Sequence, residues 1–397
     1  MRRPVLIGWS LSSFTGWGVY GVNLALAWAA DPDLQPVAAR PIFGSEIALD
    51  PLRRLAFGGV AAESQRFQTR LAEQTGDDVG VNATLLASLN DSFVRSRVPG
   101  LPLVRGRPEI AVTFFETAQL TPEAVAHAKA YPVIVAGSTW NAELLRAHGL
   151  KNVQTILQGV DTSLFHPAPR NGWLGDRFLV FSGGKLERRK GQDIVLAAFR
   201  IFAARHPEAL LAAAWHSPWP AMAASVDASG LCAPVAFQSD GAVDVAGWAE
   251  ASGVPRHQVL DLGRPANADM PRLLCEMDLA VFPNRAEGGT NLVAMEAMAC
   301  GVPTALSANT GHLDLTQDGV CYPLSDQGAV EGQGGFGDVG GWGETRPEEL
   351  AEVMERAFND RAEARRIGAA GAAKLAAMTW GETAAKMKAL VLATPAA

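Results

Sequence analysis

The chain has 397 residues and a formal net charge of −7, with 48% hydrophobic and 19% charged residues. A chain of this length predicts two or three domains, and its composition is that of a globular protein rather than a disordered one. The acidic balance, without a block of like charges, argues against nucleic acid as a main partner, because such a partner needs a basic face.

Cysteine usage and the amino terminus indicate a cytoplasmic protein without a structural metal. The four cysteines form no CxxC pair, and no zinc-ligand spacing accompanies them, which is typical of isolated thiols in a reducing compartment. The first 30 residues superficially resemble a secretory signal, but the serines and glycines between Ser10 and Gly18 interrupt the apolar stretch. No run of 18 or more apolar residues occurs, so we expect no membrane-spanning helix.

Strand-like and helix-like runs alternate along the first part of the chain. Strands are predicted at Pro4–Ile7, Ile110–Phe115, Pro132–Ala136 and Val153–Leu157. Helices are predicted at Val19–Ala29, Thr121–Lys129 and Thr139–His148. Residues 50–105 are predicted to be mainly helical, with a loop around Ser96–Arg107. Alternation of this kind favours a parallel sheet covered by helices.

A turn-rich segment, Pro167–Gly172, then predicts a linker, after which the alternation restarts. Strands are predicted at Phe178–Ser182, Leu210–Trp215, Val259–Leu262, Leu279–Pro283 and Pro303–Ser307. Helices are predicted at Gln192–Ala204, Asp269–Met277, Asn291–Cys300, Pro347–Asn359, Arg361–Ala377 and Gly381–Leu392. The glycine-rich residues 326–343 are predicted to form a long loop. The chain is therefore expected to hold two α/β units of similar size.

A cationic turn between a predicted strand and a predicted helix is the first candidate site. The segment Gly183–Asp193 contains Lys185, Arg188, Arg189 and Lys190 next to a pair of glycines. A helix start offers free amides, and lysines act as point charges on phosphate oxygens, so this arrangement suits a diphosphate. A solvated basic turn accounts for the same composition.

The second candidate site is Ala286–Gly301. Gly288 and Gly289 allow the backbone to approach a ligand, and the predicted helix from Asn291 turns its unpaired amides to the same place. Glu296 is the one carboxylate on an otherwise apolar helix, where its burial is costly without hydrogen bonds. Vicinal ribose hydroxyls would supply two donors. Pairing with a neighbouring arginine or a backbone amide is the alternative.

Two further segments carry weaker signals. Gln158–Pro167 follows a strand and has an apolar anchor at Phe165, which is typical of a turn that closes a domain. Ser12–Val19 is a glycine-rich loop between the first strand and the first helix, with glycines at Gly16 and Gly18. Such a loop can meet a phosphate or an acceptor, but one loop alone is weak support.

Together these segments resemble glycosyltransferase family 4, whose members have the GT-B fold of two Rossmann-like α/β domains facing each other across a cleft. The resemblance covers most of the chain, and residues 132–325 best. Lys185 and Lys190 stand at the family's arginine and lysine, in the order Gly-Arg-Leu, three residues, Lys-Gly. Gly159–Pro167 matches the hinge signature, and Ala297–Pro303 matches the stretch after the second glutamate.

The resemblance implies transfer of a sugar from a nucleotide-diphosphate sugar, with UDP or GDP as the nucleotide, to an acceptor hydroxyl. The acceptor would be a glycan, a glycolipid or a small molecule. The transfer would retain the anomeric configuration and use no metal or other cofactor. The implied domains are 1–168 on the acceptor side and 175–378 on the nucleotide-sugar side, followed by a helix at 379–397 that can pack back on the first domain.

The resemblance also implies a role for each matching residue. The catalytic residues would be Lys185, Lys190 and Glu287. The donor-binding residues would be Gly16, Gly18, Gly288, Gly289, Thr290, Asn291, Leu292 and Glu296. The two lysines would stabilise the departing diphosphate together with the amides of Gly289 to Leu292. Glu296 would hold the ribose, and Glu287 would bind sugar hydroxyls.

The chain departs from the family pattern in two places. The family has seven residues between its two glutamates, whereas eight separate Glu287 from Glu296. Many relatives carry a histidine in the amino-terminal domain near the reacting sugar. Here no histidine precedes His127, and the comparable strand end carries Glu116, to which the sequence assigns no role. Two alternatives therefore stay open: a sugar-nucleotide epimerase on the same scaffold, and a non-catalytic nucleotide-sugar binding protein.

Membrane contact is a separate question, raised by the segment Phe93–Arg107. It interleaves four arginines with Phe93, Val94, Val98, Leu101 and Leu103. Such a segment can rest on an anionic lipid surface that carries a lipid acceptor. The favoured interpretation is an exposed loop beside the acceptor cleft, because a second membrane signal is not evident.

Overall fold

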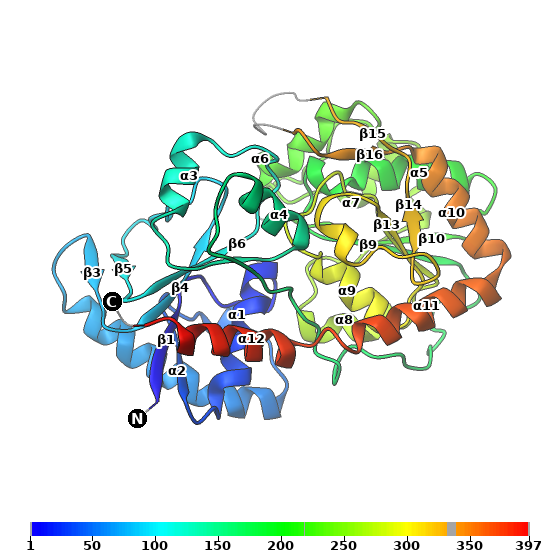
Figure 1. The fold of residues 1–397 in the computed structure, drawn as a ribbon. Helices are drawn as coiled ribbons and strands as arrows, with labels where there is room; N and C mark the ends of the chain where they lie inside the picture. Colours follow the sequence, from blue (N-terminus) through cyan, green and yellow to red (C-terminus); the bar gives the residue numbers. More distant parts are fainter. Residues whose placement is uncertain (1, 218, 332–338, 396–397) are drawn as a thin grey trace.

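Two six-stranded parallel sheets form the centres of the two halves of the chain (Figure 1). The computed structural model describes residues 2–217, 219–331 and 339–395. Helices cover both sheets, and the strands are apolar because a parallel sheet is buried on both faces. This confirms the predicted α/β class with two Rossmann-like domains.

The sheet of the N-terminal domain has the order β2-β1-β4-β6-β7-β8. Its strands are β1 (Arg3–Ile7), β2 (Leu34–Ala38), β4 (Thr84–Leu89), β6 (Glu109–Thr113), β7 (Ile134–Ala136) and β8 (Val153–Thr155). Around it lie α1 (Gly16–Ala29), η1 (Gly44–Glu46), α2 (Pro51–Ala72), α3 (Pro122–Ala128) and α4 (Thr139–Ala147). A separate parallel pair joins β3 (Asp78–Gly80) to β5 (Leu103–Arg105).

The sheet of the C-terminal domain has the order β11-β10-β9-β12-β13-β14, which is the strand order of dinucleotide-binding folds. Its strands are β9 (Leu179–Gly183), β10 (Leu210–Ala214), β11 (Val259–Asp261), β12 (Leu279–Phe282), β13 (Thr304–Ser307) and β14 (Tyr322–Leu324). The α-helices are α5 (Gln192–Ala203), α6 (Pro220–Ala223), α7 (Val245–Ala251), α8 (Met270–Leu274), α9 (Leu292–Ala299), α10 (Pro347–Asn359) and α11 (Arg361–Leu375). The 3₁₀ turns are η2 (Arg188–Lys190), η3 (Ala224–Ser229), η4 (Arg256–Gln258), η5 (Asn267–Asp269) and η6 (Thr310–Asp314).

Strand order decides where a ligand can bind. The direction of winding reverses beside β1 in one sheet and beside β9 in the other. Open parallel sheets bind ligands outside the carboxyl ends of their strands at such points. The segments after β1, β9 and β12 are the glycine-rich and cationic stretches that the sequence singles out, so the fold places all three at these sheet ends.

Two parts of the sequence-based prediction are wrong. Within residues 50–105, α2 ends at Ala72, β4 runs between β1 and β6, and β5 lies in the predicted loop. Because β4 is a short apolar run, its periodicity does not distinguish a strand from a buried helix. Within residues 326–343, β15 (Gln327–Ala329) pairs antiparallel with β16 (Gly343–Thr345), held by backbone hydrogen bonds that need no large side chains. Residues 332–338 of that predicted loop lie outside the described residues.

The chain crosses between the domains twice, and the two crossings touch. The backbone N–H of Val160 donates to the carbonyl of Met378 at 2.8 Å. A Cβ on Gly159 would lie 2.2 Å from the carbonyl carbon of Thr379, so only glycine fits at that position. Phe165 is buried, which confirms the predicted apolar anchor.

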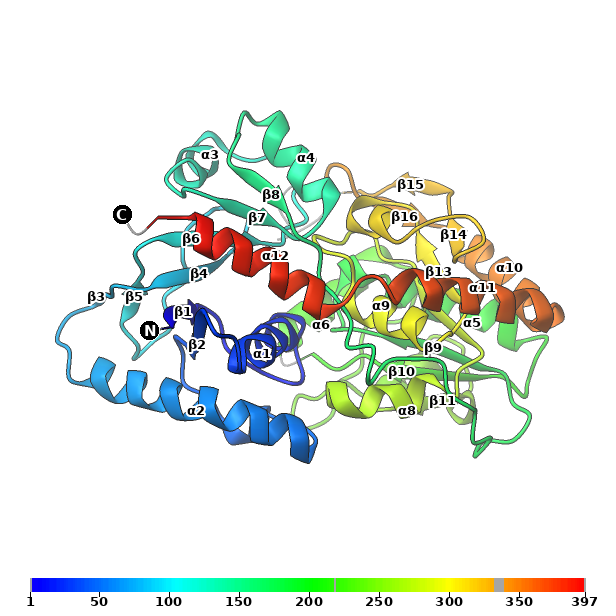
Figure 2. The ribbon, with the colours of Figure 1, turned by 60° about the horizontal axis from the view of Figure 1, so that its bottom comes forward.

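After the second crossing, α12 (Trp380–Ala393) returns to the N-terminal domain and runs beside α1 (Figures 1 and 2). The indole N–H of Trp28 donates to the carbonyl of Ala384 at 3.2 Å. Trp380 stacks on Tyr20 with ring centroids 5.4 Å apart, and both side chains are buried. The core of the N-terminal domain therefore contains a side chain from the far end of the chain.

Replacing Trp380 with alanine should destabilise the protein by about 3–5 kcal/mol, because a large buried ring is lost from the core. Urea unfolding followed by tryptophan fluorescence and circular dichroism measures this change. Trp173→Ala is the matched control, since Trp173 is 75% exposed. Equal unfolding free energies for the two variants would contradict the packing described for α12.

Candidate active site

The segment after β9 folds into a tight turn that presents three cations. Gly184 and Gly191 have positive φ values of 124° and 69°, which favour glycine. A Cβ on Gly191 would lie 2.2 Å from the carbonyl oxygen of Pro283, so the turn approaches the segment after β12 very closely. This close approach brings Lys185, Arg189 and Lys190 to the glutamates beside them.

Glu287 is the centre of the resulting network. Its Oε1 accepts hydrogen bonds from the ammonium of Lys190 and from the amide of Asn284, and its Oε2 accepts one from Arg189 at 3.1 Å. Burial alone would raise the pKa of Glu287, but the positive charges of Lys190 and Arg189 lower it to about 2. Glu287 is therefore a buried carboxylate that stays ionised at neutral pH.

Two more glutamates complete the network around Arg189 and Lys185. Glu187 accepts from Arg189 at 2.6 Å and pairs with Lys185 at 2.9 Å. Glu116, from the segment that follows β6 in the N-terminal domain, lies 3.2 Å from Arg189. The three cations are thus paired with three carboxylates, one of which comes from the opposite domain.

Gly288 and Gly289 lie against the N-terminal domain. A Cβ on Gly288 would lie 2.6 Å from the backbone nitrogen of Phe115, and one on Gly289 would lie 2.9 Å from the ring of Phe114. The amide of Gly288 donates to Glu116 at 3.3 Å. The glycines therefore permit close contact between the two domains, a constraint that the sequence does not show.

Helix α9 begins at Leu292, shortly after these glycines. Asn291 caps it from a left-handed conformation with φ 62°, and its side chain accepts from the amide of Ala294. The amide group of Asn291 lies 3.1 Å from His312 Nε2. Thr290 is fully buried and donates to the sulfur of Met295 at 2.9 Å, and Leu292 is the first helical residue. These contacts hold the start of α9 at the edge of the network.

Glu296 lies on α9, apart from the network in the described structure. It is 5% exposed and accepts a hydrogen bond from the side chain of Asn267. Burial raises the pKa of Glu296 to about 8, although the hydrogen bond from Asn267 opposes the rise. The backbone N–H of Asn267 donates to the carbonyl of Ser13 at 2.8 Å, so the loop after β1 lies close by.

The two glycines of the loop after β1 differ in their surroundings. A Cβ on Gly16 would meet no atom within 4 Å, whereas one on Gly18 would lie 2.5 Å from the Cβ of Ser12. Thr15 caps α1 by accepting from the amide of Gly18 at 3.2 Å. Gly16 is therefore open to a ligand, and Gly18 is required for packing within its own loop.

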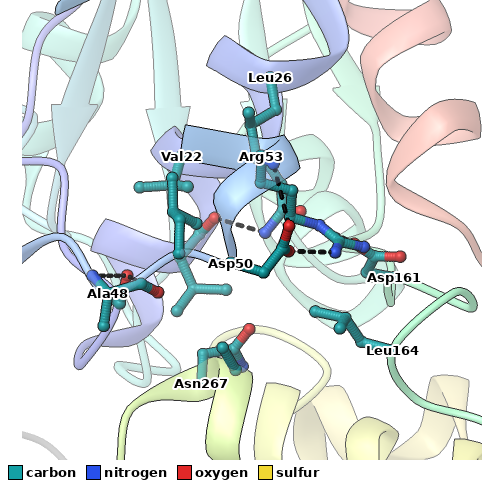
Figure 3. A pocket seen from close by; sticks show the side chains of 13 residues that line it. Val22, Leu26, Ala48, Asp50, Arg53, Asp161, Leu164 and Asn267 are labelled. Atoms are coloured by element: carbon teal, nitrogen blue, oxygen red, sulfur yellow. Dashed lines mark hydrogen bonds and ion pairs between the residues drawn. The ribbon is translucent and has the colours of Figure 1, made fainter. Parts of the chain in front are cut away.

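Asn267 also lines a small pocket where α1, α2 and the first crossing meet (Figure 3). Arg53 reaches from α2 into this region and pairs with Asp161 and with Asp50, each at 2.6 Å. Asp161 belongs to the crossing that the sequence identifies as a hinge. Asp161 of the hinge and Asn267, which holds Glu296, therefore line the same pocket.

The structure brings some of the predicted site residues together and leaves others apart. Lys185, Lys190 and Glu287 share the network described above, and Gly288, Gly289, Thr290, Asn291 and Leu292 lead from it into α9. Glu296 lies apart from it, held by Asn267 beside the loop after β1 that carries Gly16 and Gly18. Sequence reasoning gave no role to Asn267, Asn284 or His312, and none of the three stands in a recognisable motif.

The family model for glycosyl transferases group 1 matches residues 168–374, which is more than half of the chain. The chain belongs to this family. It is therefore an enzyme that transfers sugars, and family membership argues against the non-catalytic alternative.

Two relatives are similar in sequence. A GDP-mannose-dependent α-(1-6)-phosphatidylinositol monomannoside mannosyltransferase of Mycolicibacterium smegmatis is 30% identical over 175 residues, spanning 41% of this chain and 40% of that protein. A D-inositol 3-phosphate glycosyltransferase 1 of Catenulispora acidiphila is 25% identical over 386 residues, spanning 91% of this chain and 84% of that protein. Both relatives are named as glycosyltransferases.

Solved structures of glycosyltransferases share the whole fold. Sucrose-phosphate synthase from Thermosynechococcus elongatus superposes with a TM-score of 0.64 at 17% identity, covering 98% of both chains. The HepE protein of Anabaena, solved in complex with UDP, superposes with a TM-score of 0.62 at 15% identity, covering 100% of both chains. These likenesses confirm the GT-B fold.

Every helix in residues 2–217, 219–331 and 339–395 is too short or too polar to traverse a lipid bilayer. The same residues bring together no group of three or more His, Cys, Asp or Glu side chains that could hold a metal ion.

The raised pKa of Glu296 predicts a pH-dependent stability in the absence of ligand. The pKa of this carboxyl is 4.5 in the unfolded chain and about 8 in the folded protein. At a pH between these two values, the carboxyl is ionised when the chain is unfolded and protonated when it is folded. Stability should therefore fall as pH rises through this window, by up to about 1.4 kcal/mol per pH unit. Glu296→Gln should remove the fall, so the melting temperature of the variant should increasingly exceed that of the parent from pH 5 to pH 8. Glu352→Gln, at an exposed position of α10, serves as the control and should follow the parent.

Proposed function

We propose that this enzyme transfers a sugar from a nucleotide-diphosphate sugar to an acceptor hydroxyl, with retention at the anomeric carbon and without a metal. The observation that carries the proposal is the Lys190–Glu287–Arg189 network at the carboxyl ends of β9 and β12, beside the start of α9. Cations and helix amides are the groups that bind diphosphates in folds of this kind. HepE, which shares the fold, is solved with UDP and with UDP-glucose.

In this proposal Lys185 and Lys190 stabilise the departing diphosphate together with the amides of Gly289 to Leu292. Preorganised positive charge at a leaving group is commonly the largest catalytic contribution, and here it replaces a metal ion. Arg189 joins these cations, because it contacts the same carboxylates as the lysines. Glu296 accepts from the ribose hydroxyls, which take the place of its hydrogen bond from Asn267.

Glu287 keeps room for one hydroxyl of the donor sugar. A carboxylate offers about four acceptor positions, two on each oxygen. Lys190 and Asn284 occupy both positions on Oε1, and Arg189 occupies one on Oε2. The remaining position on Oε2 binds the sugar, while the rest of the carboxylate holds the cations in place.

Glu116 balances the charge of the network while the donor is absent. The donor adds negative charge to a network in which carboxylates already match the cations. Glu116 comes from the opposite domain, so a small separation of the domains removes it from Arg189 and from the amide of Gly288. The diphosphate sugar then takes over both positions, and reclosure of the domains excludes water from the reaction.

The acceptor is proposed to be a hydroxyl on a glycan, a glycolipid or a small molecule. One relative is named for a phosphatidylinositol mannoside and the other for inositol 3-phosphate. The acceptor would enter from the N-terminal domain beside Gly16, where the loop after β1 leaves open space.

A screen of UDP-, GDP- and ADP-sugars by thermal shift should identify one nucleotide class that raises the melting temperature. A donor at one hundred times its Kd should stabilise the protein by about 2.7 kcal/mol. Glu296→Gln should weaken the shift, whereas Glu352→Gln should preserve it.

With the selected donor and an acceptor panel, the product should keep the donor's anomeric configuration by NMR, and EDTA should leave the rate unchanged. An inverted product, or a donor epimerised without any acceptor, would refute the proposal.

Lys190→Ala should lower kcat by about 10²–10³, by analogy with loss of one preorganised donor at a developing anion. Steady-state kinetics at saturating donor measure the effect. Lys190→Arg keeps the positive charge and should recover part of the rate. Comparing the two variants separates the catalytic effect of this charge from its effect on the stability of the Glu287 network. Lys151→Ala, at an exposed lysine of the N-terminal domain, is the control. Near-normal turnover by a folded Lys190→Ala enzyme would exclude this role for the lysine.

A further inference from the structure

A second, strongly basic pocket lies in the N-terminal domain. It has a volume of about 720 Å³ and is lined by residues between Phe93 and Pro132. These residues come from the segment around β5, from the approach to β6 and from the end of α3. Its lining includes no residue of the C-terminal domain, and β5 lies at the far end of the molecule from that domain (Figures 1 and 2). The pocket is therefore separate from the active site.

The pocket concentrates positive charge in an acidic protein. The cations that line it are Arg95, Arg97, Arg105, Arg107 and Lys129. Glu109 is the one carboxylate among the lining residues, whereas the whole chain has a net charge of −7. The excess of positive charge around this pocket therefore does not follow from the overall composition of the chain.

Neighbouring carboxylates neutralise only part of this charge. Glu109 pairs with Arg95 at 3.2 Å, and Asp78, from β3, pairs with both Arg97 and Arg105. Arg107 and Lys129 have no acidic partner in the part of the chain that the structure describes. Two cations are thus left to meet a ligand.

Arg95 marks the most confined part of the positive charge. Its side chain is 10% exposed and is held by the carbonyl of Val104 as well as by Glu109. Burial lowers the pKa of Arg95, and the nearby charge of Arg105 adds to the lowering although Glu109 opposes it. A bound anion would relieve this crowding of like charges.

The shape of the pocket favours a compact solute over a membrane. Among the apolar side chains that the sequence offers for membrane contact, Phe93 and Leu103 are buried, and Val98 and Leu101 are half-buried. Val94 is the large apolar residue of this segment that is well exposed, at 51%. Insertion into lipid needs a broad apolar face, whereas guanidinium groups around a hollow suit phosphate oxygens.

We propose that this pocket binds a compact, multiply charged phosphate compound at a site distinct from the active site. The arginines supply paired N–H donors to phosphate oxygens, and Lys129 adds a mobile point charge. Such a ligand is a phosphate ester or a polyphosphate in solution. Lipid headgroups carry the same phosphate groups, and a vesicle-binding experiment distinguishes a lipid surface from a soluble ligand.

Titration calorimetry of the full chain with sodium tripolyphosphate tests the proposal. The double variant with Arg107→Gln and Lys129→Gln should bind at least about tenfold more weakly, because each change removes a charged hydrogen-bond donor. The matched control carries Arg365→Gln and Lys386→Gln, which remove two exposed cations from α11 and α12. Both pairs lie on the surface, so melting temperatures should agree and report intact folding. The proposal would be overturned if the control variant bound tripolyphosphate more weakly while the pocket variant kept the affinity of the parent. It would also be overturned if all three proteins bound tripolyphosphate with the same affinity.

Cosedimentation with vesicles separates the two sources of phosphate. The parent protein should remain in solution with phosphatidylcholine vesicles containing phosphatidic acid, while it binds tripolyphosphate. Binding to the anionic vesicles without measurable tripolyphosphate binding would overturn the proposal in favour of a membrane surface. Tripolyphosphate binding should also weaken as the salt concentration rises, because screening reduces the attraction between exposed charges.

Discussion

The arrangement of the active-site loops depends on the hydrogen bonds and ion pairs that the buried carboxylate of Glu287 accepts. Its two oxygens gather Lys190, Arg189 and Asn284, which come from the segments after β9 and β12. Its backbone is fixed as well, since its N–H donates to the hydroxyl of Thr310 at 2.8 Å. Removing one member of a buried ion pair leaves an uncompensated charge, at a cost of about 3–5 kcal/mol. The geometry of these loops therefore depends on all members of the network together.

The same loops also carry contacts between the domains. The hydroxyl of Ser138 donates to the carbonyl of Gly288 at 2.8 Å, and the N–H of Thr139 donates to Asp314 at 2.8 Å. Glu116 adds a charged contact to Arg189. The loops that are proposed to bind the donor therefore also hold the domains together. In the proposed transfer, donor binding and a separation of the domains would use these same atoms.

The sequence predicts the fold class and most of the elements, since helix and strand periods are local signals. The strand β4 escapes prediction because Thr84–Leu89 is a short apolar run without a distinguishing period. The sequence also singles out Lys185, Lys190 and Glu287, which the structure joins in one network. Their detailed roles in transfer stay predictions.

Other features of the site could not be predicted because they depend on distant parts of the chain. Glu116 and Arg189 are 73 positions apart, and no local pattern indicates that they meet. The partner of Glu296 is likewise invisible, because Asn267 lies in a short 3₁₀ turn without a motif. Gly288 and Gly289 suggest a ligand in the sequence, whereas the space beside them is filled by Phe115 and Phe114.

The return of α12 has a consequence for how the protein is made. Trp380 and Met387 belong to the same core as Val5 and Tyr20, near the other end of the chain. A ribosome releases the strands of the N-terminal domain long before it releases the helix that completes their core. Domains usually fold as units in the order of synthesis. This N-terminal domain must instead wait, with part of its apolar surface uncovered, until translation has passed through the entire C-terminal domain.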